Sequence, residues 1–282
     1  LYVILYITNI YLWAALGDNM TVISPEDSDK DRWGRSRLID WLDIEQVQSA
    51  RYLVLGAGAL GNETIKGLVL SGARDITLVD MDHVVRSNLS RCVMFREKDG
   101  AERRWKAEAV AERAIEIDPG ARVRPVVGRI EQLSDDEWKT YDVVLGCLDN
   151  IAARLHANSH SYFNGVPYID GGTEGVAGRV QTIVPPFSPC LQCGLNRSHY
   201  RVLERRHSCT GSELTYYRPA MAAEITTTSI IAAVQVLEAL KLVCGRYDAV
   251  IRNVMHYNGL RNSWDELELS IEPACPLHIK TS

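Results

Sequence analysis

The chain has 282 residues, of which 46% are hydrophobic, so it is long enough to bury a large core in one α/β domain or in a domain with a small appendage. Its formal net charge of −5 argues against a nucleic-acid-binding protein, which would need a basic face. Seven scattered cysteines do not form a disulfide scaffold, so we expect a reducing compartment and a cytoplasmic location.

Residues 1–31 predict a leader or mobile extension outside the fold. Residues 1–16 are almost wholly apolar, but they lack a basic segment and are shorter than the ~20 residues of a membrane span. A truncated anchor is the alternative. Residues 18–31 are polar and acidic, and Met20 begins a stretch typical of a natural start. We therefore expect no membrane partner.

The segment from 51 to 91 predicts a strand, a glycine turn, a helix and a second strand, which together form a nucleotide-binding βαβ unit. Gly56 allows the tight turn, and Gly58 lets backbone N–H groups approach a phosphate. Gly61 lets the helix lie close to the sheet. The glycines alone do not identify the nucleotide.

Asp80 lies nineteen residues beyond Gly61, where a carboxylate can accept hydrogen bonds from a ribose diol. An NAD-binding oxidoreductase would have the same arrangement and stays a rival. The run that follows, with Asp82, Asn88 and Arg91, suits a triphosphate better than a nicotinamide ring, because Asn and Arg side chains can hold phosphate oxygens.

The glycine turn and the run from Asp80 to Arg91 resemble the adenylation domain of the ThiF/MoeB/HesA group and of ubiquitin-activating enzymes, whose pattern is GxGxxG followed by DxDxVxxSNLxR. The resemblance extends from about Arg32 to His278. It implies a Rossmann-like, doubly wound α/β fold with a mainly parallel sheet, an antiparallel extension and a structural zinc site. Residues 32–282 would form this adenylation domain, with a short crossover segment around 194–221.

The resemblance implies that Arg35 and Lys106 contact the phosphates of ATP. Arg35 ends an Arg-Trp-Gly-Arg run similar to the family's RYxRQ motif, with Ser36 in place of Gln, and in the family this arginine often comes from the partner protomer. Lys106 begins a predicted helix that stops at Asp118-Pro119, where family members also start with a lysine. The alternative for each residue is a solvated cation at a helix start.

Asp149 follows a predicted buried strand over residues 141–147, at the sheet edge where doubly wound folds bind ligands. It resembles the family aspartate that binds Mg²⁺ and is indispensable for adenylation, and Arg154 completes the DNxxxR pattern. The alternative is a helix N-cap. The run from Asp170 to Gly175 resembles ubiquitin-type activating enzymes, and its glycines would leave room for an extended peptide tail.

Two pairs of metal-ligating residues lie far apart in the sequence, Cys190 with Cys193 and Cys275 with His278. The two-residue gap in each pair lets both side chains face one tetrahedral ion, which gives Cys₃His zinc coordination. Family members carry C-x-x-C at both positions, with zinc remote from the active site, so His278 replaces the last cysteine. The rival, a redox C-x-x-C, lacks a thioredoxin-like setting.

Cys209 lies between these pairs, in a run with Arg205, Arg206 and His207. Neighbouring cations raise the thiolate fraction of a cysteine, which favours a nucleophile. The position of Cys209 also resembles the catalytic cysteine of ubiquitin-type activating enzymes, although their full cysteine domain is absent here. The other three cysteines are expected to be small core residues: Cys92, Cys147 and Cys244.

The resemblance implies an ATP-dependent activating enzyme that adenylylates the C-terminal carboxylate of a ubiquitin-like or sulfur-carrier protein with a Gly-Gly tail. A thioester on Cys209 would follow, and a conjugating enzyme could receive the product. The family also implies a homodimer. Homologues that modify peptides or tRNA, and non-catalytic partner subunits, are the alternatives within the family.

Hydrophobic periodicity and turn signals predict the remaining elements. After Arg32 a helical pattern places Leu38, Trp41, Leu42 and Val47 on one face. The other expected elements are a helix through His160, strands over 122–127, 167–170 and 178–184, a long buried helix over 222–244, and antiparallel closing strands over 249–257 and 266–271.

Overall fold

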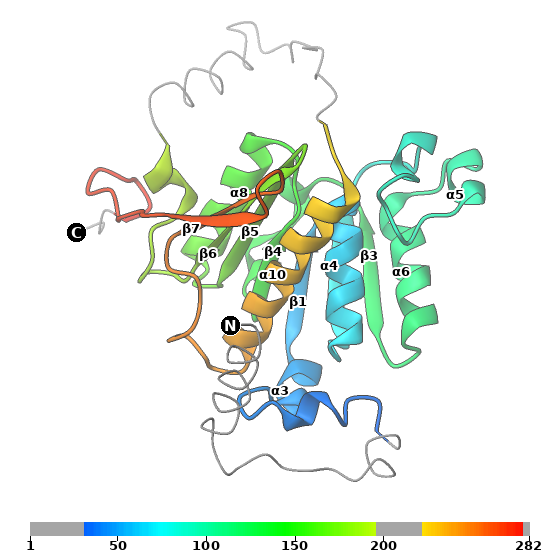
Figure 1. Ribbon diagram of the computed structural model, residues 1–282, viewed down its shortest axis with the longest axis horizontal. Coiled ribbons are helices and arrows are strands. Elements are labelled where there is room, and N and C mark those ends of the chain that lie inside the picture. The colour runs from blue at the N-terminus through cyan, green and yellow to red at the C-terminus, as the bar shows by residue number, and fades with distance from the viewer. Residues whose placement is uncertain (1–30, 196–221, 279–282) are drawn as a thin grey trace, which may run out of the picture.

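The computed structural model describes residues 31–195 and 222–278 (Figure 1). The predicted leader apart from Asp31, most of the predicted crossover segment and Cys209 lie outside these ranges.

The described chain forms one mainly parallel sheet of eight strands in the order β3-β2-β1-β4-β5-β6-β7-β8. The first five strands in this order pair in parallel, whereas β6, β7 and β8 pair antiparallel. The doubly wound fold with an antiparallel extension is therefore confirmed. The strands are β1 Arg51–Leu55, β2 Asp75–Asp80, β3 Arg122–Val127, β4 Val143–Gly146, β5 Tyr168–Glu174, β6 Ala177–Ile183, β7 Val254–Asn258 and β8 Ser263–Leu267.

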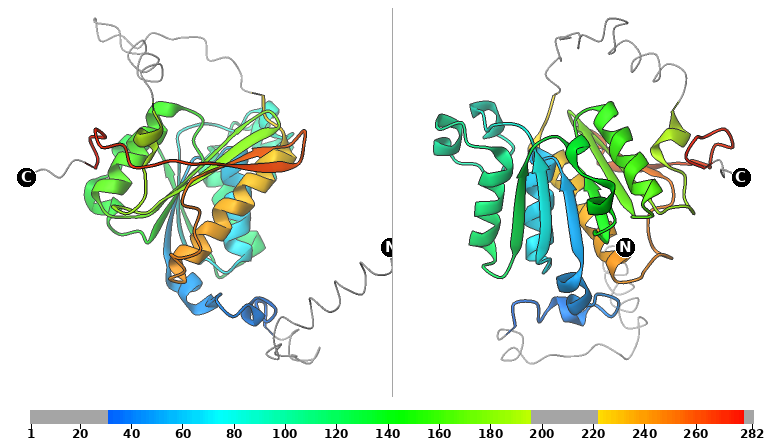
Figure 2. Two further views of the ribbon diagram at one scale, coloured as in Figure 1. Left: turned by 60° about the vertical axis from the view of Figure 1, so that its left-hand side comes forward. Right: turned by 180° about the vertical axis from the view of Figure 1, so that it is seen from behind.

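Helices cover both faces of the parallel part of the sheet (Figures 1 and 2). On one face α4, α6 and α10 pack together, and α8 with the short α7 covers the other. The α-helices are α3 Ile44–Ser49, α4 Ala59–Leu70, α5 Glu97–Ala101, α6 Lys106–Ile117, α7 Asp135–Trp138, α8 Ile151–Phe163 and α10 Ile225–Val243, and the 3₁₀ helices are η1 Ser36–Leu38, η2 Arg86–Asn88, η3 Ile130–Gln132 and η4 Leu191–Gly194.

The central strand β1 shows why its apolar run forms a parallel strand. Its residues 52–55 are all fully buried, because helices cover the sheet on both sides. Tyr52 and Val54 pack in the core beneath α4 and α10, and Leu53 and Leu55 pack in the core beneath α8. The strand thus holds the glycine turn at the carboxyl edge between two packed layers.

The segment before β1 differs from the single helical pattern that we predicted. It forms η1 and then α3, with Asp43 between them accepting a hydrogen bond from the Gln46 backbone N–H at 3.1 Å. This carboxylate caps α3 and so separates the two helices. Val47 is buried as expected, but Leu38 is 40% exposed, so the two residues do not share a buried face.

The closing strands pair antiparallel as predicted and overlap the predicted ranges 249–257 and 266–271, but their bounds differ. They are β7 and β8, joined by a turn in which the Asn258 side chain accepts from the backbone N–H groups of Leu260 and Arg261. This side-chain turn ends β7 at Asn258 and lets β8 begin at Ser263, which the strand pattern alone did not locate.

Helix α10 has the length and hydropathy of a membrane span, and it is the one such helix in the described residues. Here it is a core helix that packs against α4, β5 and β6. Its buried Glu238 accepts from Thr182 Oγ1 at 2.9 Å and from the Ile251 backbone N–H at 2.7 Å, so the carboxylate is satisfied within the protein.

Candidate functional site

The glycine turn after β1 divides its three glycines between two tasks. Gly56 has φ +100°, and a Cβ there would lie 2.5 Å from the Cys147 carbonyl oxygen. A Cβ on Gly61 would lie 1.9 Å from the Gly56 oxygen. A Cβ on Gly58 would meet nothing within 4 Å. The fold therefore requires Gly56 and Gly61, and Gly58 leaves open space beside the turn.

Helix α4 begins directly at this turn, with Gly58 at the N-cap position and no side chain capping the helix. The first N–H groups of α4 are therefore free to meet an anion, which the positive end of the helix dipole also favours. The buried Asn62 side chain supports the turn by donating to the carbonyls of Ala57 and Gly58, each at 2.9 Å.

Asp80, at the end of β2, holds the turn from the side. Its carboxylate accepts from the Ala57 N–H at 2.7 Å and from the Asp82 N–H at 2.8 Å. Burial raises the pKa of Asp80 above its ordinary value, although nearby Lys106 and both N–H groups act in the opposite direction. The carboxylate lies at the correct edge to accept from a ribose, in addition to its role in fixing the turn.

Lys106 is the first residue of α6, and its Nζ lies 2.9 Å from Asp82 Oδ2. Its side chain is only 12% exposed, so it is not the freely solvated helix-start lysine of the alternative interpretation. The pairing with Asp82 was not predicted, although the spacing of two aspartates in Asp80-x-Asp82 is visible in the sequence. A phosphate at this position would compete with Asp82 for the same cation.

Asn88 and Arg91 lie in the loop after β2, and their side chains form hydrogen bonds with the backbone of the same loop. The side-chain oxygen of Asn88 accepts from the Val85 N–H at 3.0 Å, and Arg91 Nη1 donates to the Ser87 carbonyl at 2.7 Å. Asn88 is 8% exposed. The side-chain oxygen of Asn88 therefore shapes the loop.

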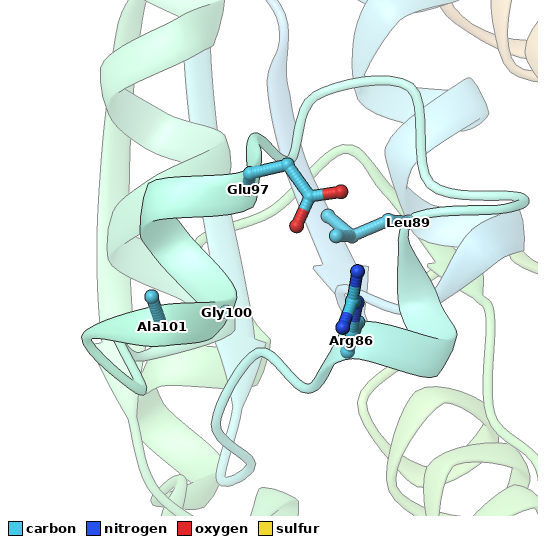
Figure 3. A pocket seen from close by; sticks show the side chains of 5 residues that line it. All are labelled: Arg86, Leu89, Glu97, Gly100 and Ala101. Carbon is cyan, nitrogen blue, oxygen red and sulfur yellow. The ribbon is translucent and has the colours of Figure 1, made fainter.

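A pocket of about 360 Å³ lies beside this loop, between η2 and α5 (Figure 3). The side chains of Arg86, Leu89 and Glu97 point toward one another across it. Gly100 and Ala101 complete its lining, so it contains none of the predicted nucleotide-binding residues.

Asp149 follows the carboxyl end of β4 and is exposed. The helix-cap alternative for this residue is wrong, because Asn150 caps α8 by accepting from the Ala153 N–H at 2.8 Å. Asn150 Nδ2 also lies 3.4 Å from Asp149 Oδ1. Mg²⁺ is bound by carboxylate oxygens together with water and substrate phosphates, so an exposed carboxylate such as that of Asp149 could serve as a ligand.

Arg154, on the first turn of α8, is held by a buried carboxylate. Its Nε donates to Asp170 Oδ1 at 2.8 Å, and its Nη2 donates to Asp170 Oδ2. Tyr168 donates to the same carboxylate at 3.0 Å, and Arg179 lies 3.6 Å away. Asp170 is 1% exposed, so this buried cluster ties α8 to β5 and β6.

Two glycines of the Asp170–Gly175 run do not provide the room for a peptide tail that we expected. A Cβ on Gly171 would lie 2.4 Å from Gln235, and a Cβ on Gly172 would lie 2.7 Å from Arg154. Side chains of the protein itself occupy that space, because α10 and α8 pack against these two positions.

Arg35 lies at the opposite end of the sheet from the glycine turn. The neighbouring Trp33 donates from Nε1 to the carbonyl of Leu70 at 3.1 Å, at the end of α4, and Arg32 donates to the carbonyl of Ile117 at the end of α6. The 12 residues of α4 separate this end from the turn by about 18 Å. A single chain therefore does not bring Arg35 to the predicted phosphate site.

The four predicted zinc ligands meet although 85 residues separate Cys190 from Cys275. Their ligand atoms all lie within 4.8 Å of one another. Cys190 Sγ is 3.8 Å from Cys193 Sγ and 3.6 Å from Cys275 Sγ. The Nε2 atom of His278 is buried without a hydrogen-bond partner, which is the state expected of a nitrogen that ligates a metal.

The other two buried cysteines behave as core residues. Burial raises the pKa of Cys92 to about 11 and that of Cys147 to about 12, so neither is a thiolate at neutral pH. Cys244 is partly exposed and packs against the core at the end of α10.

The fold and the glycine turn define a Rossmann-like nucleotide-binding protein whose ligand edge carries three aspartates and a lysine. More specifically, the model of the ThiF family matches residues 34–277, and the chain belongs to this family.

Several relatives are named as subunits of activating enzymes. The chain is 33% identical over 158 residues to the NEDD8-activating enzyme E1 catalytic subunit of Schizosaccharomyces pombe, covering 54% of this chain and 35% of the relative. It is 32% identical over 152 residues to SUMO-activating enzyme subunit 2 of Dictyostelium discoideum, covering 53% of this chain and 23% of the relative. The chain thus spans 35% or less of the length of these relatives.

Solved structures show the same fold. The crystal structure of E. coli MccB with ATP has a TM-score of 0.72 at 18% identity, covering 93% of this chain and 76% of MccB. The crystal structure of E. coli MccB with MccA has a TM-score of 0.74 at 19% identity, covering 94% and 79%. At this identity the similarity extends to the fold alone.

Proposed function

We propose that the protein uses ATP to adenylylate the C-terminal carboxylate of a ubiquitin-like or sulfur-carrier protein. One observation carries the proposal. The glycine turn, the group formed by Asp80, Asp82 and Lys106, and the exposed Asp149 follow the carboxyl ends of three neighbouring strands, β1, β2 and β4. They therefore lie at one edge of the sheet, where doubly wound folds bind ligands.

Each group has a separate task in this reaction. The N–H groups at the start of α4 bind phosphate oxygens, and Asp80 accepts from the ribose. Lys106 exchanges Asp82 for a phosphate, with Arg91 and Asn88 nearby, and Asp149 would hold the Mg²⁺ that neutralises charge on the triphosphate. The carrier's carboxylate oxygen bonds to the α-phosphorus, the bond to pyrophosphate breaks, and an acyl-adenylate forms.

A thioester step would follow on Cys209. The Cys209 thiolate attacks the acyl carbon, the bond to the phosphate oxygen breaks and AMP leaves. The support for this step is the cationic sequence around Cys209 and the similarity to activating enzymes for ubiquitin-like proteins. A conjugating enzyme is then the expected acceptor, and a Gly-Gly tail is the expected substrate end.

A structural zinc ion is proposed to bind the cluster of Cys190, Cys193, Cys275 and His278. Three sulfurs and one unpartnered imidazole nitrogen are a suitable donor set for tetrahedral Zn²⁺. The ion would join the segment after β6 to the segment after β8. These two segments are 85 residues apart in sequence, so a local turn could not link them. Its contribution is to folding.

The working form is proposed to be a homodimer in which Arg35 of one protomer completes the phosphate site of the other. Two observations support this arrangement. Arg35 is exposed at the far end of its own sheet, and the adjacent Leu38 and Ile39 are 40% and 44% exposed. A cytoplasmic location belongs to the same proposal.

ATP–pyrophosphate exchange in the presence of a Gly-Gly-ended ubiquitin-like protein tests the function. Asp149→Asn should lower exchange by at least about 100-fold, because it removes charge from the metal ligand, and should leave the unfolding midpoint unchanged. Asp136→Asn on α7, which removes another exposed carboxylate, is the matched control. Full exchange by the Asp149 variant would refute the site, and binding of NAD in place of ATP would favour the oxidoreductase alternative.

A second candidate is the same adenylylation on a short peptide, favoured by the fold similarity to MccB, which is solved with MccA. A family member that modifies tRNA is the remaining alternative. Comparing exchange with a folded carrier, with its isolated C-terminal peptide and with tRNA separates these substrates.

A further inference from the structure

Tyr162, near the end of α8, contacts the one histidine of the metal cluster. Its Oη lies 3.1 Å from Nδ1 of His278, and the two ring centroids are 4.8 Å apart. The other nitrogen of that ring, Nε2, is buried and has no partner. The imidazole thus has one nitrogen in a hydrogen bond and one available to the three sulfurs.

The direction of the Tyr162 hydrogen bond decides whether His278 can bind a metal. A neutral imidazole carries its proton on one nitrogen and its lone pair on the other. If Nδ1–H donates to Tyr162 Oη, the lone pair is on Nε2, whereas a proton on Nε2 would block coordination.

We propose that Tyr162 is a positioning residue for the zinc site: its hydroxyl oxygen accepts from Nδ1–H of His278 and so holds the tautomer and the ring orientation in which Nε2 ligates the ion. This inference rests on the zinc site of the proposed function. Partners of this kind on ligating histidines contribute about 10- to 100-fold in metal affinity.

The same contact fastens the C-terminal ligand pair to α8. Asn158, one turn earlier on that helix, accepts from the Leu191 backbone N–H of the first ligand pair at 3.0 Å. Helix α8 therefore contacts both halves of the zinc cluster through two side chains, and its N-cap residue Asn150 is next to Asp149 in the chain.

The test is a double-mutant cycle in the full-length protein. Tyr162→Phe is made in the natural chain and in a His278→Cys background, where the fourth ligand has no N–H to donate. Tyr141→Phe is the matched control, since the Tyr141 hydroxyl bonds Arg124 instead of the cluster. Zinc affinity is measured by competition with a chromogenic chelator, and the ligand set is followed by the absorption spectrum of the Co²⁺-substituted protein.

We expect Tyr162→Phe to weaken zinc binding about 10- to 100-fold when residue 278 is His, and to leave it unchanged in the His278→Cys background. Equal losses in both backgrounds would mean that Tyr162 acts only by packing, and would overturn the inference, as would no loss in either. If the unmodified protein fails to bind zinc or cobalt, the zinc site itself is wrong, an outcome distinct from failure of the Tyr162 effect.

Discussion

Lys106 pairs with an aspartate that is far more exposed than the lysine itself. The two side chains are 12% and 57% exposed. An ion pair with an exposed partner is weak, because water competes for the carboxylate. Asp82 can therefore turn toward solvent when a phosphate approaches, and the Lys106 ammonium that it releases already acts on Asp80, which holds the glycine turn.

Substitutions of Lys106 and of Asp82 should have different effects on ATP–pyrophosphate exchange. Lys106→Met should reduce ATP–pyrophosphate exchange by about 100-fold or more, because a fixed cation at the triphosphate is lost. Asp82→Asn, which removes the competitor and keeps the cation, should preserve exchange. Equal loss in both variants would show that the ion pair matters for folding and that Lys106 does not contact ATP.

In the turn between β1 and α4, some glycines are required by the fold and another leaves space for a ligand. A Cβ at Gly61 would overlap the Gly56 oxygen, whereas one at Gly58 would enter open space. The two glycines look equivalent in the GxGxxG pattern, and only the close approach of helix to turn makes one of them structural.

Alanine substitutions should reveal this division. Gly61→Ala should lower the free energy of unfolding by about 1–3 kcal/mol, because the added methyl forces α4 away from the turn. Gly58→Ala should keep the thermal unfolding midpoint but weaken ATP binding, since the methyl occupies the space of a phosphate. Calorimetric unfolding and nucleotide titration measure the two effects separately. An unstable Gly58→Ala protein would contradict the assignment.

Helix α8 carries a second feature, a histidine whose charge state depends on folding. Burial lowers the pKa of His156, and the neighbouring His160 lowers it further, against opposing effects of Glu131 and Asp135. The unfolded chain therefore takes up a proton at higher pH than the folded one does. The free energy of unfolding should fall as pH drops below about 6.5.

Replacing His156 should reduce this pH dependence. Urea unfolding of the natural chain and of His156→Gln, at several pH values between 7.5 and 5 with constant zinc, gives the slope for each. As the pH falls, the free energy of unfolding should decrease less in the variant than in the natural chain. The difference between the two slopes should correspond to less than one proton. Identical slopes would mean that the folded protein protonates His156 as readily as the unfolded chain does.

For the whole molecule, the decisive arrangement is the separation of Arg35 from the glycine turn by the length of α4. A site that needs both must be shared between two copies, which a two-fold symmetric dimer would supply twice.

Mixing two inactive variants tests the shared site. Subunits with Arg35→Ala lack the arginine, and subunits with Asp149→Ala lack the proposed metal ligand. In a re-formed heterodimer one of the two sites has both natural residues, so an equal mixture should recover about a quarter of the natural exchange activity. If each chain contains its whole site, the mixture will be no more active than its components.

The sequence by itself determined the order of the elements around the ligand edge. The apolar run of β1, the glycine turn and Asp80 were located correctly, because short apolar runs and turn glycines are local signals. The two pairs Cys190–Cys193 and Cys275–His278 were also predicted to form one cluster, since each pair has the spacing of a metal site.

Only the tertiary structure decided which side chains meet. That Lys106 pairs with Asp82, that Asp170 holds Arg154, that Tyr162 contacts His278 and that Arg35 lies far from the turn all depend on packing between segments distant in sequence. The N-cap of α8 is Asn150 and not Asp149. A shift of one residue in the start of the helix decides which side chain reaches its first N–H groups, and the sequence does not fix a helix start that closely.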